Sequence, residues 1–440
     1  MREHQHLSVD VVVVGAGLAG LAAAHRLAVN GRTVRVIESE GAPGGRARTD
    51  WYQGRPVDRG FQVAFSAYPS FGKLVREIGI PADDLRPLSG GAAFFDGGRW
   101  SQLSSSPKPL LGFSGLGASD RARLARLAAE VRFAPGASLL ARDDVAPTTE
   151  GFLRARGFSE QAIDGVFRPL FGVIFLDRSL SADPGYFLFL FSMLVRGPVV
   201  LPADGLGMIA DWAAGAIRKA GGHFEFGTRV ISLVRDGDGA LTGVRLEDDR
   251  PIHARAVVLA VDALAARRLL SPVDPQTAAR IPSDGASVTS ARFGLDHSLY
   301  RGRVVLLNGA PGIPPGPRID LLCQTTNVNR HGAVGGPHIV VATSIGDSDA
   351  TAAGIEEAVE HQVHRWYPGF PWAKVAHSLG VVRHPFAQFR PLAGVRRGLP
   401  GARTNVRNLV LAGEFTMQPS LEGAVSSGVR AAEIVDRQLG

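Results

Sequence analysis

A strand, a glycine-spaced turn and a helix near the start of the chain constrain its fold more than any other segment. Residues 9–14 are rich in β-branched side chains, which is typical of a strand buried on both faces of a parallel sheet. Residues 21–29 have the alanine and leucine content of a helix, and residues 33–38 form a second β-branched run. This order predicts a βαβ unit with a right-handed crossover, and therefore an α/β fold.

The turn after the first strand carries three glycines in the spacing of a dinucleotide-binding loop. Gly15 allows the tight turn, Gly17 lets the backbone approach a pyrophosphate, and Gly20 permits close packing of the helix on the sheet. The amino end of the helix then directs its dipole at the phosphates. Glu38 ends the second strand, where its carboxylate is expected to accept hydrogen bonds from ribose hydroxyls.

A second glycine loop follows the acidic residue directly and indicates which dinucleotide is bound. Residues 44–49 read Gly-Gly-Arg-Ala-Arg-Thr, and a simple nicotinamide site has no need of such a loop. The segment resembles the flavoprotein pattern G-G-R-x-R-[ST], which extends an FAD site. Gly44 and Gly45 would let the backbone pass close to the cofactor, and Arg46 would set a cation against its phosphates or the flavin edge.

Further segments resemble the amine oxidase and phytoene desaturase superfamily of FAD enzymes. Residues 57–62 are similar to the segment that passes beside the isoalloxazine, and residues 409–414 and 421–428 are similar to the closing strand and helix, whose amino end faces the flavin pyrimidine. Residues 201–208, 227–230 and 256–262 also match the family in the right order. The resemblance implies noncovalent FAD held by Gly15, Gly17, Leu18, Ala19, Gly20, Glu38, Ser39, Gly44, Gly45, Arg46, Gly60, Phe61, Gln62, Val230, Gly413, Glu414, Glu422, Gly423 and Ala424.

With 440 residues and 45% hydrophobic composition, the chain is long enough for two domains. We predict a discontinuous Rossmann-like FAD-binding domain from residues 1–75, 202–270 and 385–440. Residues 76–201 and 271–384 are expected to form a substrate domain of antiparallel sheet, with a helical insertion at about 110–200. Within it, residues 118–132, 149–170 and 186–195 read as helices, and residues 224–234 read as one strand.

Two aromatic-rich stretches of the insertion, residues 167–175 and 186–195, have two interpretations of equal weight. Large apolar side chains at helical spacing form a plain core, or they line a tunnel for a lipophilic substrate or a surface that touches a membrane. Flavin enzymes of this superfamily take a hydride from a C–C or C–N bond onto flavin N5. The shape of the pocket therefore decides the substrate.

The sequence favours C–C chemistry over amine oxidation. Amine oxidases of the superfamily commonly place an aromatic residue just before the closing helix, where this chain has Ser420, and a lysine at flavin N5. None of Lys73, Lys108, Lys219 and Lys374 aligns with that lysine. Residues 58–70 and 168–177 resemble desaturase-like members. We predict a desaturase- or dehydrogenase-like enzyme for a lipophilic or secondary-metabolite substrate, with an amine oxidase and a non-redox or isomerase flavoprotein as alternatives.

The sequence indicates the catalytic residues less clearly than the residues that contact the cofactor. Tyr68, His384, Arg390 and Glu414 lie near cofactor-like segments, and Tyr68 and Arg390 are the predicted catalytic residues. The single cysteine, Cys323, falls in the predicted substrate sheet, so it predicts neither a disulfide nor a covalent flavin. No clustered spacing of His and carboxylate residues indicates a metal site.

Charge and terminal sequence bear on partners and location. The net charge is +7, but the basic residues are scattered, so nucleic acid is not an expected partner. Oxygen or a quinone is the expected electron acceptor. No secretory signal and no apolar run of about 20 residues is visible. A cytoplasmic enzyme, with peripheral membrane contact as an option, is predicted; the oligomeric state is not.

Overall fold

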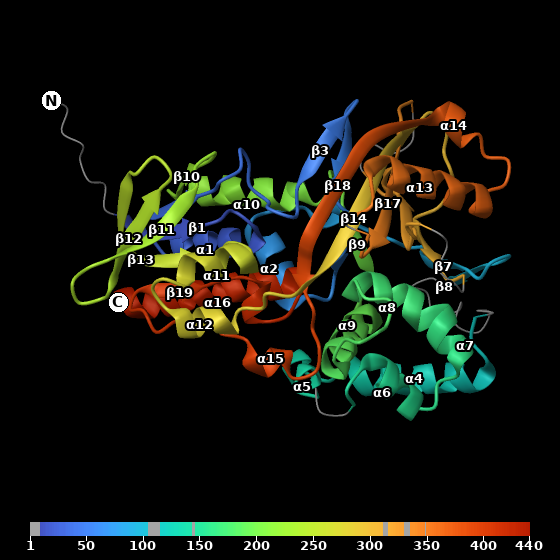
Figure 1. Ribbon diagram of the computed structural model, residues 1–440, viewed down its shortest axis with the longest axis horizontal. Helices are drawn as coiled ribbons and strands as arrows, with labels where there is room; N and C mark the ends of the chain where they lie inside the picture. Colours follow the sequence, from blue (N-terminus) through green and yellow to red (C-terminus); the bar gives the residue numbers. More distant parts are fainter. Residues whose placement is uncertain (1–8, 104–114, 143–145, 311–315, 330–334, 348) are drawn as a thin grey trace.

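The computed structural model describes residues 9–103, 115–142, 146–310, 316–329, 335–347 and 349–440. Its first layer is a parallel sheet at the left of Figure 1, in the order β10, β2, β1, β13 and β19. The pairs β1–β2, β1–β13, β2–β10 and β13–β19 are all parallel. The predicted βαβ unit is present, and its strands are β1 (Val9–Val14), β2 (Val34–Ile37), β10 (His223–Glu225), β13 (Pro251–Leu259) and β19 (Leu409–Leu411).

Strand β1 is buried on both faces, as its valine content predicts. Val11 and Val13 pack on one side with the helices, and Val12 and Val14 pack on the other with an antiparallel layer. The helical face is formed by α1 (Leu18–Val29), α10 (Gly207–Lys219) and α16 (Leu421–Leu439). The opposite face is covered by β11 (Val230–Arg235), β12 (Leu241–Leu246) and α11 (Ala263–Leu270). This arrangement fixes the amino end of α1 at the carboxyl edge of the sheet.

A second sheet forms the right half of the molecule in Figure 1. Its order is β18, β14, β17, β16, β15, β7 and β8, and its pairs are antiparallel except for the parallel pair of β15 and β7. Helix α13 (Ala352–Trp366) covers one face, and residues of the other face, Leu307, Leu321 and Cys323, belong to the same core cluster as the insertion helices and β1. The strands are β7 (Gly91–Phe95), β8 (Trp100–Leu103), β14 (Gly285–Leu295), β15 (Val304–Asn308), β16 (Leu321–Gln324), β17 (His338–Ile345) and β18 (Ala376–Phe389).

Helices from the predicted insertion pack below the second sheet in Figure 1. They are α4 (Ala118–Arg132), α5 (Gly136–Leu140), α6 (Thr149–Ala155), α7 (Glu160–Ala162), the π-helical turn η2 (Ile163–Phe167), α8 (Arg168–Phe175) and α9 (Pro184–Arg196). The single helix predicted over residues 149–170 is wrong. Gly157 takes a positive φ of 79° after α6, and the Ser159 hydroxyl caps α7 by accepting from the Ala162 amide.

The single strand predicted over residues 224–234 is also wrong. Gly227 has a φ of 66°, in the left-handed region, and reverses the chain there. The two halves therefore join different layers, because β10 pairs with β2 and β11 pairs with β12. The division of the chain into two domains at the predicted boundaries stays a prediction.

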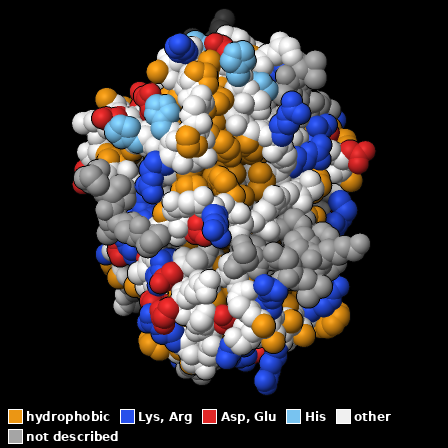
Figure 2. Space-filling model, turned by 90° about the vertical axis from the view of Figure 1, so that its right-hand side faces the viewer, with side chains coloured by type: hydrophobic (Ala, Val, Ile, Leu, Met, Phe, Trp, Pro, Cys, Tyr) orange, Lys and Arg blue, Asp and Glu red, His pale blue; other side chains and the backbone are white. Residues whose placement is uncertain are grey.

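Short elements connect these layers. They are β3 (Thr49–Tyr52), β4 (Arg55–Asp58), β5 (Ala64–Phe65), α2 (Pro69–Glu77), η1 (Ala82–Asp84), β6 (Leu85–Pro87), β9 (Val199–Pro202), α12 (Pro275–Arg280), η3 (Thr325–Asn327), α14 (Trp372–Val375), α15 (Val395–Gly398) and η4 (Glu414–Thr416). Figure 2 shows the right-hand side of Figure 1, where hydrophobic side chains form a band in the upper middle of the view with basic side chains on either side of it. Among the described helices, none combines the length and apolarity that a bilayer crossing requires.

The contact between α1 and α16 gives a test of the packing. A Cβ atom on Gly428 would lie 2.1 Å from the Ala19 carbonyl oxygen, whereas a Cβ atom on Gly215, in α10, would meet nothing within 4 Å. We expect Gly428→Ala to lower the free energy of unfolding by about 2 kcal/mol. Gly215→Ala should raise it by about 0.5–1 kcal/mol, because alanine restricts the unfolded chain. Urea denaturation followed by circular dichroism measures both, and equal effects would contradict the close approach of the two helices.

Candidate active site

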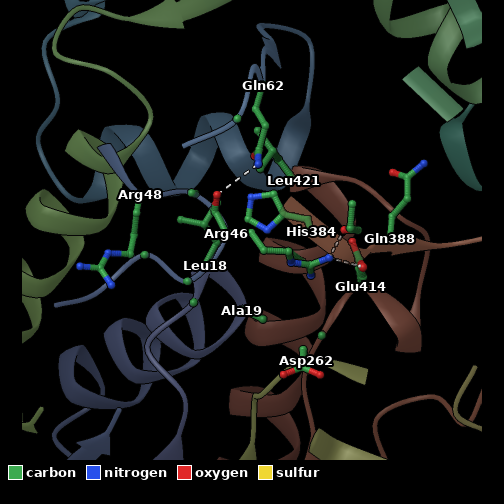
Figure 3. A pocket seen from close by; sticks show the side chains of 18 of the residues that line it. Leu18, Ala19, Arg46, Arg48, Gln62, Asp262, His384, Gln388, Glu414 and Leu421 are labelled. Atoms are coloured by element: carbon green, nitrogen blue, oxygen red, sulfur yellow. Dashed lines mark hydrogen bonds and ion pairs between the residues drawn. The ribbon is translucent and has the colours of Figure 1, made fainter. Parts of the chain in front are cut away.

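A cavity of about 820 Å³ lies between the two sheets. Its lining begins at the glycine turn after β1, continues along residues 38–40, 44–48, 59–63 and 65, and reaches residues 413–415, 419–421 and 424 of the closing segment. Two further walls complete it, one from the second sheet and one from α8 and α9. Figure 3 shows the central part, where residues from both halves of the chain face one another.

The three glycines of the turn have separate structural reasons. Gly15 has a φ of 101°, and a Cβ atom there would lie 2.7 Å from the Ala260 carbonyl oxygen. A Cβ atom on Gly20 would lie 1.9 Å from the Gly15 oxygen, so this glycine brings α1 against the strand end. Gly17 is different, because a Cβ atom there would meet nothing within 4 Å and would project into open space beside the cavity. Gly15 and Gly20 therefore build the turn, and Gly17 keeps space free for a ligand.

The amino end of α1 is suited to an anionic group. Gly17 caps the helix without any side-chain hydrogen bond, so the first-turn amides face the cavity without a protein partner at the cap. The Glu38 carboxylate lies beside them and accepts hydrogen bonds from the amides of Ala16, at 2.7 Å, and Glu40, at 2.9 Å. The first-turn amides of α1 fit a diphosphate, and the Glu38 carboxylate fits the hydroxyl groups of a ribose. The residues present therefore match a dinucleotide of the FAD type.

Arg46 lies at the centre of the cavity and bridges the two ends of the chain. One guanidinium nitrogen donates to Glu414 Oε1 at 2.8 Å and also to the Ala387 carbonyl oxygen. The Arg46 carbonyl accepts from the Gln62 side-chain amide at 3.2 Å, as the dashed lines in Figure 3 show. The predicted contact of Arg46 with the cofactor stays a prediction, and its protein partner is Glu414.

Asp58 supports the loop that carries Gly60, Phe61 and Gln62. Its Oδ1 atom accepts from the Thr49 hydroxyl and from the Leu206 amide, the latter at 2.9 Å. Burial raises the pKa of the Asp58 carboxyl to about 6, while these two hydrogen bonds act in the opposite direction. The side chain thereby joins β4 to the start of α10 and holds the following loop over the cavity.

The cavity is completed by two unlike walls. The wall from α8, α9 and the residue after α8 is apolar apart from one phenol and consists of Val173, Ile174, Leu176, Tyr186 and Leu190. The wall from the second sheet mixes apolar and polar residues: Val288, Ser290, Leu321, Thr343, Val382, Arg383, His384, Ala387 and Gln388. Most of the aromatic residues predicted as core or tunnel are core, since Phe167, Phe171, Phe175, Phe187 and Phe191 pack against one another away from the lining.

Most of the predicted cofactor residues line the cavity. These are Gly15, Gly17, Leu18, Ala19, Glu38, Ser39, Gly44, Gly45, Arg46, Gly60, Phe61, Gln62, Val230, Gly413, Glu414 and Ala424. Gly20, Glu422 and Gly423 do not. The Glu422 carboxylate instead accepts from the Ser70 and Phe71 amides, each at 3.0 Å, and so caps α2. A Cβ atom on Gly423 would lie 1.9 Å from the Gln418 oxygen, so this glycine serves the turn before α16.

The two predicted catalytic residues lie in unequal positions. Tyr68 lines the cavity but is 3% exposed, and burial together with the Glu422 charge raises the pKa of its phenol above the ordinary value. It is therefore a poor proton acceptor. Arg390 does not line the cavity, and its Nε atom lies 3.5 Å from Asp284 Oδ2. The catalytic role predicted for Arg390 has no support in this geometry.

His384, weighed only as a candidate, is better placed than either. Figure 3 shows its ring beside the Arg46 side chain and below Gln62. Burial lowers the pKa of His384, and the nearby charges of Arg46 and Arg59 lower it further, so the ring is neutral near pH 7. Ser290, Thr343 and Gln388 also line the cavity and were not predicted, because no local motif marks them. Asp262 lines it too; it ends the matched segment 256–262 but was not among the predicted site residues.

Comparison with known proteins shows to which family this chain belongs. The model of the flavin containing amine oxidoreductase family matches residues 18–436. The chain belongs to this family. Hydroxysqualene dehydroxylase of Rhodopseudomonas palustris is 28% identical over 462 residues, which cover 98% of this chain and 99% of that protein. Hydroxyneurosporene desaturase of Cereibacter sphaeroides is 28% identical over a region that covers 58% of this chain and 56% of that protein.

The solved structures agree with the fold. An oxidoreductase from Methanosarcina mazei superposes with a TM-score of 0.78 at 18% identity, covering 96% of this chain and 100% of that one. The chain is thus an FAD-dependent oxidoreductase of the mixed α/β fold predicted from its motifs. Cys323, its single cysteine, is fully buried in β16, and burial raises the pKa of its thiol to about 12. Noncovalent FAD is consistent with this position.

Asp58 gives a prediction for pH. A carboxyl whose pKa is higher in the folded than in the unfolded state stabilises the fold fully below pH 4, and this contribution is lost as pH rises to about 6. We expect the free energy of unfolding of the wild type, relative to Asp58→Asn, to fall by about 3 kcal/mol across this window. Urea denaturation at several pH values measures the difference. A difference that stays constant with pH would contradict a raised pKa.

Gly17 offers a cleaner test of the cofactor loop than Gly15, whose strained φ and close neighbours would confound any substitution. We expect Gly17→Val to fold but to be purified without yellow colour, because the side chain occupies the place of the pyrophosphate. Gly41→Val is the matched control, since a Cβ atom there also meets nothing within 4 Å and the residue does not line the cavity. Absorbance at the flavin band relative to protein measures the occupancy, and full occupancy in Gly17→Val would refute this site.

Proposed function

We propose that the protein removes a hydride from a C–H bond of a lipophilic substrate, in the manner of a desaturase or dehydrogenase, and transfers it to flavin N5. The apolar wall carries this proposal. Val173, Ile174, Leu176 and Leu190 present hydrocarbon to the cavity, and the described carboxylates of the lining, Glu38, Glu40, Asp262 and Glu414, all come from the cofactor half. A substrate in contact with α8 and α9 meets no acidic side chain.

The residues of this chain bind and position the substrate rather than activate it. The helical wall and the sheet wall exclude water and hold the reacting bond over the loop at Gly60. Bound FAD supplies the hydride acceptor, which the protein itself lacks. The substrate loses a proton in the same overall reaction, and Tyr68 does not take it because its phenol is buried with a raised pKa.

The names of two relatives support the choice of substrate class. The protein that matches over the full length is named for the dehydroxylation of hydroxysqualene, and another is named for the desaturation of hydroxyneurosporene. Oxygen or a quinone is the acceptor that we propose for the electrons. Peripheral contact with a membrane fits a lipophilic substrate and is part of the same proposal.

Amine oxidation is the second candidate, and one observation favours it. Amine oxidases commonly have an aromatic residue at the position of Ser420. Tyr68 and Tyr186 line the cavity close to Ser420, so two aromatic rings lie near this position although residue 420 itself is not aromatic. The Ser420 hydroxyl caps α16 by accepting from the Gly423 amide at 2.9 Å. Lys73, Lys219 and Lys374 do not line the cavity, and Lys108 lies outside the described residues. The lysine expected of an amine oxidase is therefore absent from the described lining.

An anaerobic titration of the yellow protein distinguishes the candidates. We expect detergent-solubilised polyenes and isoprenoids to bleach the flavin absorbance and amines to leave it unchanged. Bleaching by an amine alone would make the protein an amine oxidase, and bleaching by neither would favour a non-redox or isomerase flavoprotein. Ile174→Glu places a charge in the apolar wall and should slow bleaching at least tenfold. Ile231→Glu, on the exposed side of β11, is the matched control and should not.

A further inference from the structure

The sheet wall of the cavity holds three polar side chains that have no hydrogen-bond partner among the described residues. The unpartnered atoms are Ser290 Oγ, Thr343 Oγ1 and His384 Nε2, and each is shielded from solvent. Ser290 is 1% and Thr343 is 6% exposed. Buried hydroxyl groups in proteins are almost always hydrogen-bonded, so an unpartnered group that lines a cavity points to a ligand.

The register of the sheet places the three side chains together. Ser290 in β14 lies directly opposite Thr343 in β17, so their Cβ atoms are about 5 Å apart on the same face. His384 in β18 lies opposite Val288, which shares that face with Ser290 because side chains alternate along a strand. Ser290, Thr343 and His384 therefore form one polar group that spans three adjacent strands, with β14 in the middle.

Space for a ligand atom is available above this group. Gly60 faces it, and a Cβ atom on Gly60 would lie 3.6 Å from Ser290 Oγ and 3.9 Å from His384 Nε2. The absence of a side chain at Gly60 leaves this gap open. Apolar side chains of Val288, Leu321 and Val382 surround the polar group on the same wall, and the apolar residues of α8 and α9 line the cavity with them.

The chemistry of the group selects a neutral oxygen. Hydroxyl groups and a neutral imidazole both donate and accept hydrogen bonds, as an alcohol does, and they carry no charge to compensate a buried ammonium ion or carboxylate. The cationic side chains near this group are engaged with other partners. Arg46 pairs with Glu414 at 2.8 Å and Arg59 pairs with Asp50 at 3.1 Å. Arg383, which also lines the cavity, donates to the Ala350 oxygen at 2.6 Å.

We propose that Ser290, Thr343 and His384 bind a hydroxyl group of the otherwise lipophilic substrate, an inference that rests on the function proposed above. The apolar walls bind the hydrocarbon, and the polar group fixes its position along the cavity over the loop at Gly60. The three residues are positioning residues that determine specificity. A site that hydrogen-bonds a substrate hydroxyl rejects the analogue that lacks it, because its own polar groups stay unpaired.

The test measures binding without turnover. The flavin-loaded protein is dialysed anaerobically to equilibrium against tritiated farnesol and, separately, against tritiated 2,6,10-trimethyldodeca-2,6,10-triene, the C15 hydrocarbon in which a hydrogen atom replaces the hydroxyl group of farnesol. We expect the wild type to bind the alcohol at least tenfold more tightly. The double variant Ser290→Ala, Thr343→Val should lose this preference to within about threefold, with its affinity for the hydrocarbon unchanged or increased.

A control variant and a stability measurement separate binding from structure. Val288→Ala lies on the same strand and face as Ser290, so it should weaken both ligands by the same factor. The double variant should melt at or above the wild-type temperature, because the hydroxyl groups that it removes have no protein partner. A lower melting temperature would assign them a structural role and overturn the inference.

The remaining outcomes are distinct. Equal binding of alcohol and hydrocarbon by the wild type would overturn this inference alone, and would leave water as the occupant of the polar group. A preference for the alcohol that survives in the double variant would do the same. No binding of either isoprenoid, with the flavin bound, would overturn the proposed function and this inference together.

Discussion

The close approach of backbone to backbone at the glycine turn is the constraint on which the rest of the site depends. Helix α1 lies so near the end of β1 that even one methylene group at Gly20 would collide with the Gly15 carbonyl. Helix α16 approaches α1 as closely at Gly428. These contacts hold the amino end of α1 and the closing segment at the same edge of the sheet. The cofactor half of the cavity follows from them, because both segments line it.

Local signals in the sequence predicted the parts of the fold that are built locally. The βαβ unit and the glycine spacing lie within about 30 residues, so their geometry follows from turn chemistry and strand burial. Glu422 was different. Its segment was identified correctly, but its carboxylate caps α2, a helix some 350 residues earlier, and no nearby residue signals that contact. Segments 149–170 and 224–234 failed at Gly157 and Gly227, whose positive φ values break elements that the apolar pattern alone extends.

The polar group of the sheet wall was missed for a related reason. Ser290 and Thr343 are ordinary residues of alternating strands, and neither lies in a motif. Their meeting depends on the pairing of β14 with β17, across a separation of more than 50 residues. The predicted aromatic stretches show the converse. Their helical spacing left a core and a tunnel as equal interpretations. Most of the phenylalanines form a core, and the residues that reach the cavity are mostly their aliphatic neighbours, which periodicity does not distinguish.

The side chain of Gln388 connects the two unlike walls. Its amide nitrogen donates to the Phe175 carbonyl oxygen at 2.7 Å and to the Ile174 oxygen at 3.3 Å, and Figure 3 shows it at the edge of the cavity. These carbonyls belong to the last turn of α8, and the next residue, Leu176, takes a left-handed conformation with a φ of 53°. One side chain of the sheet thus ties β18 to the end of α8. The two walls can move apart at this place only if these hydrogen bonds break.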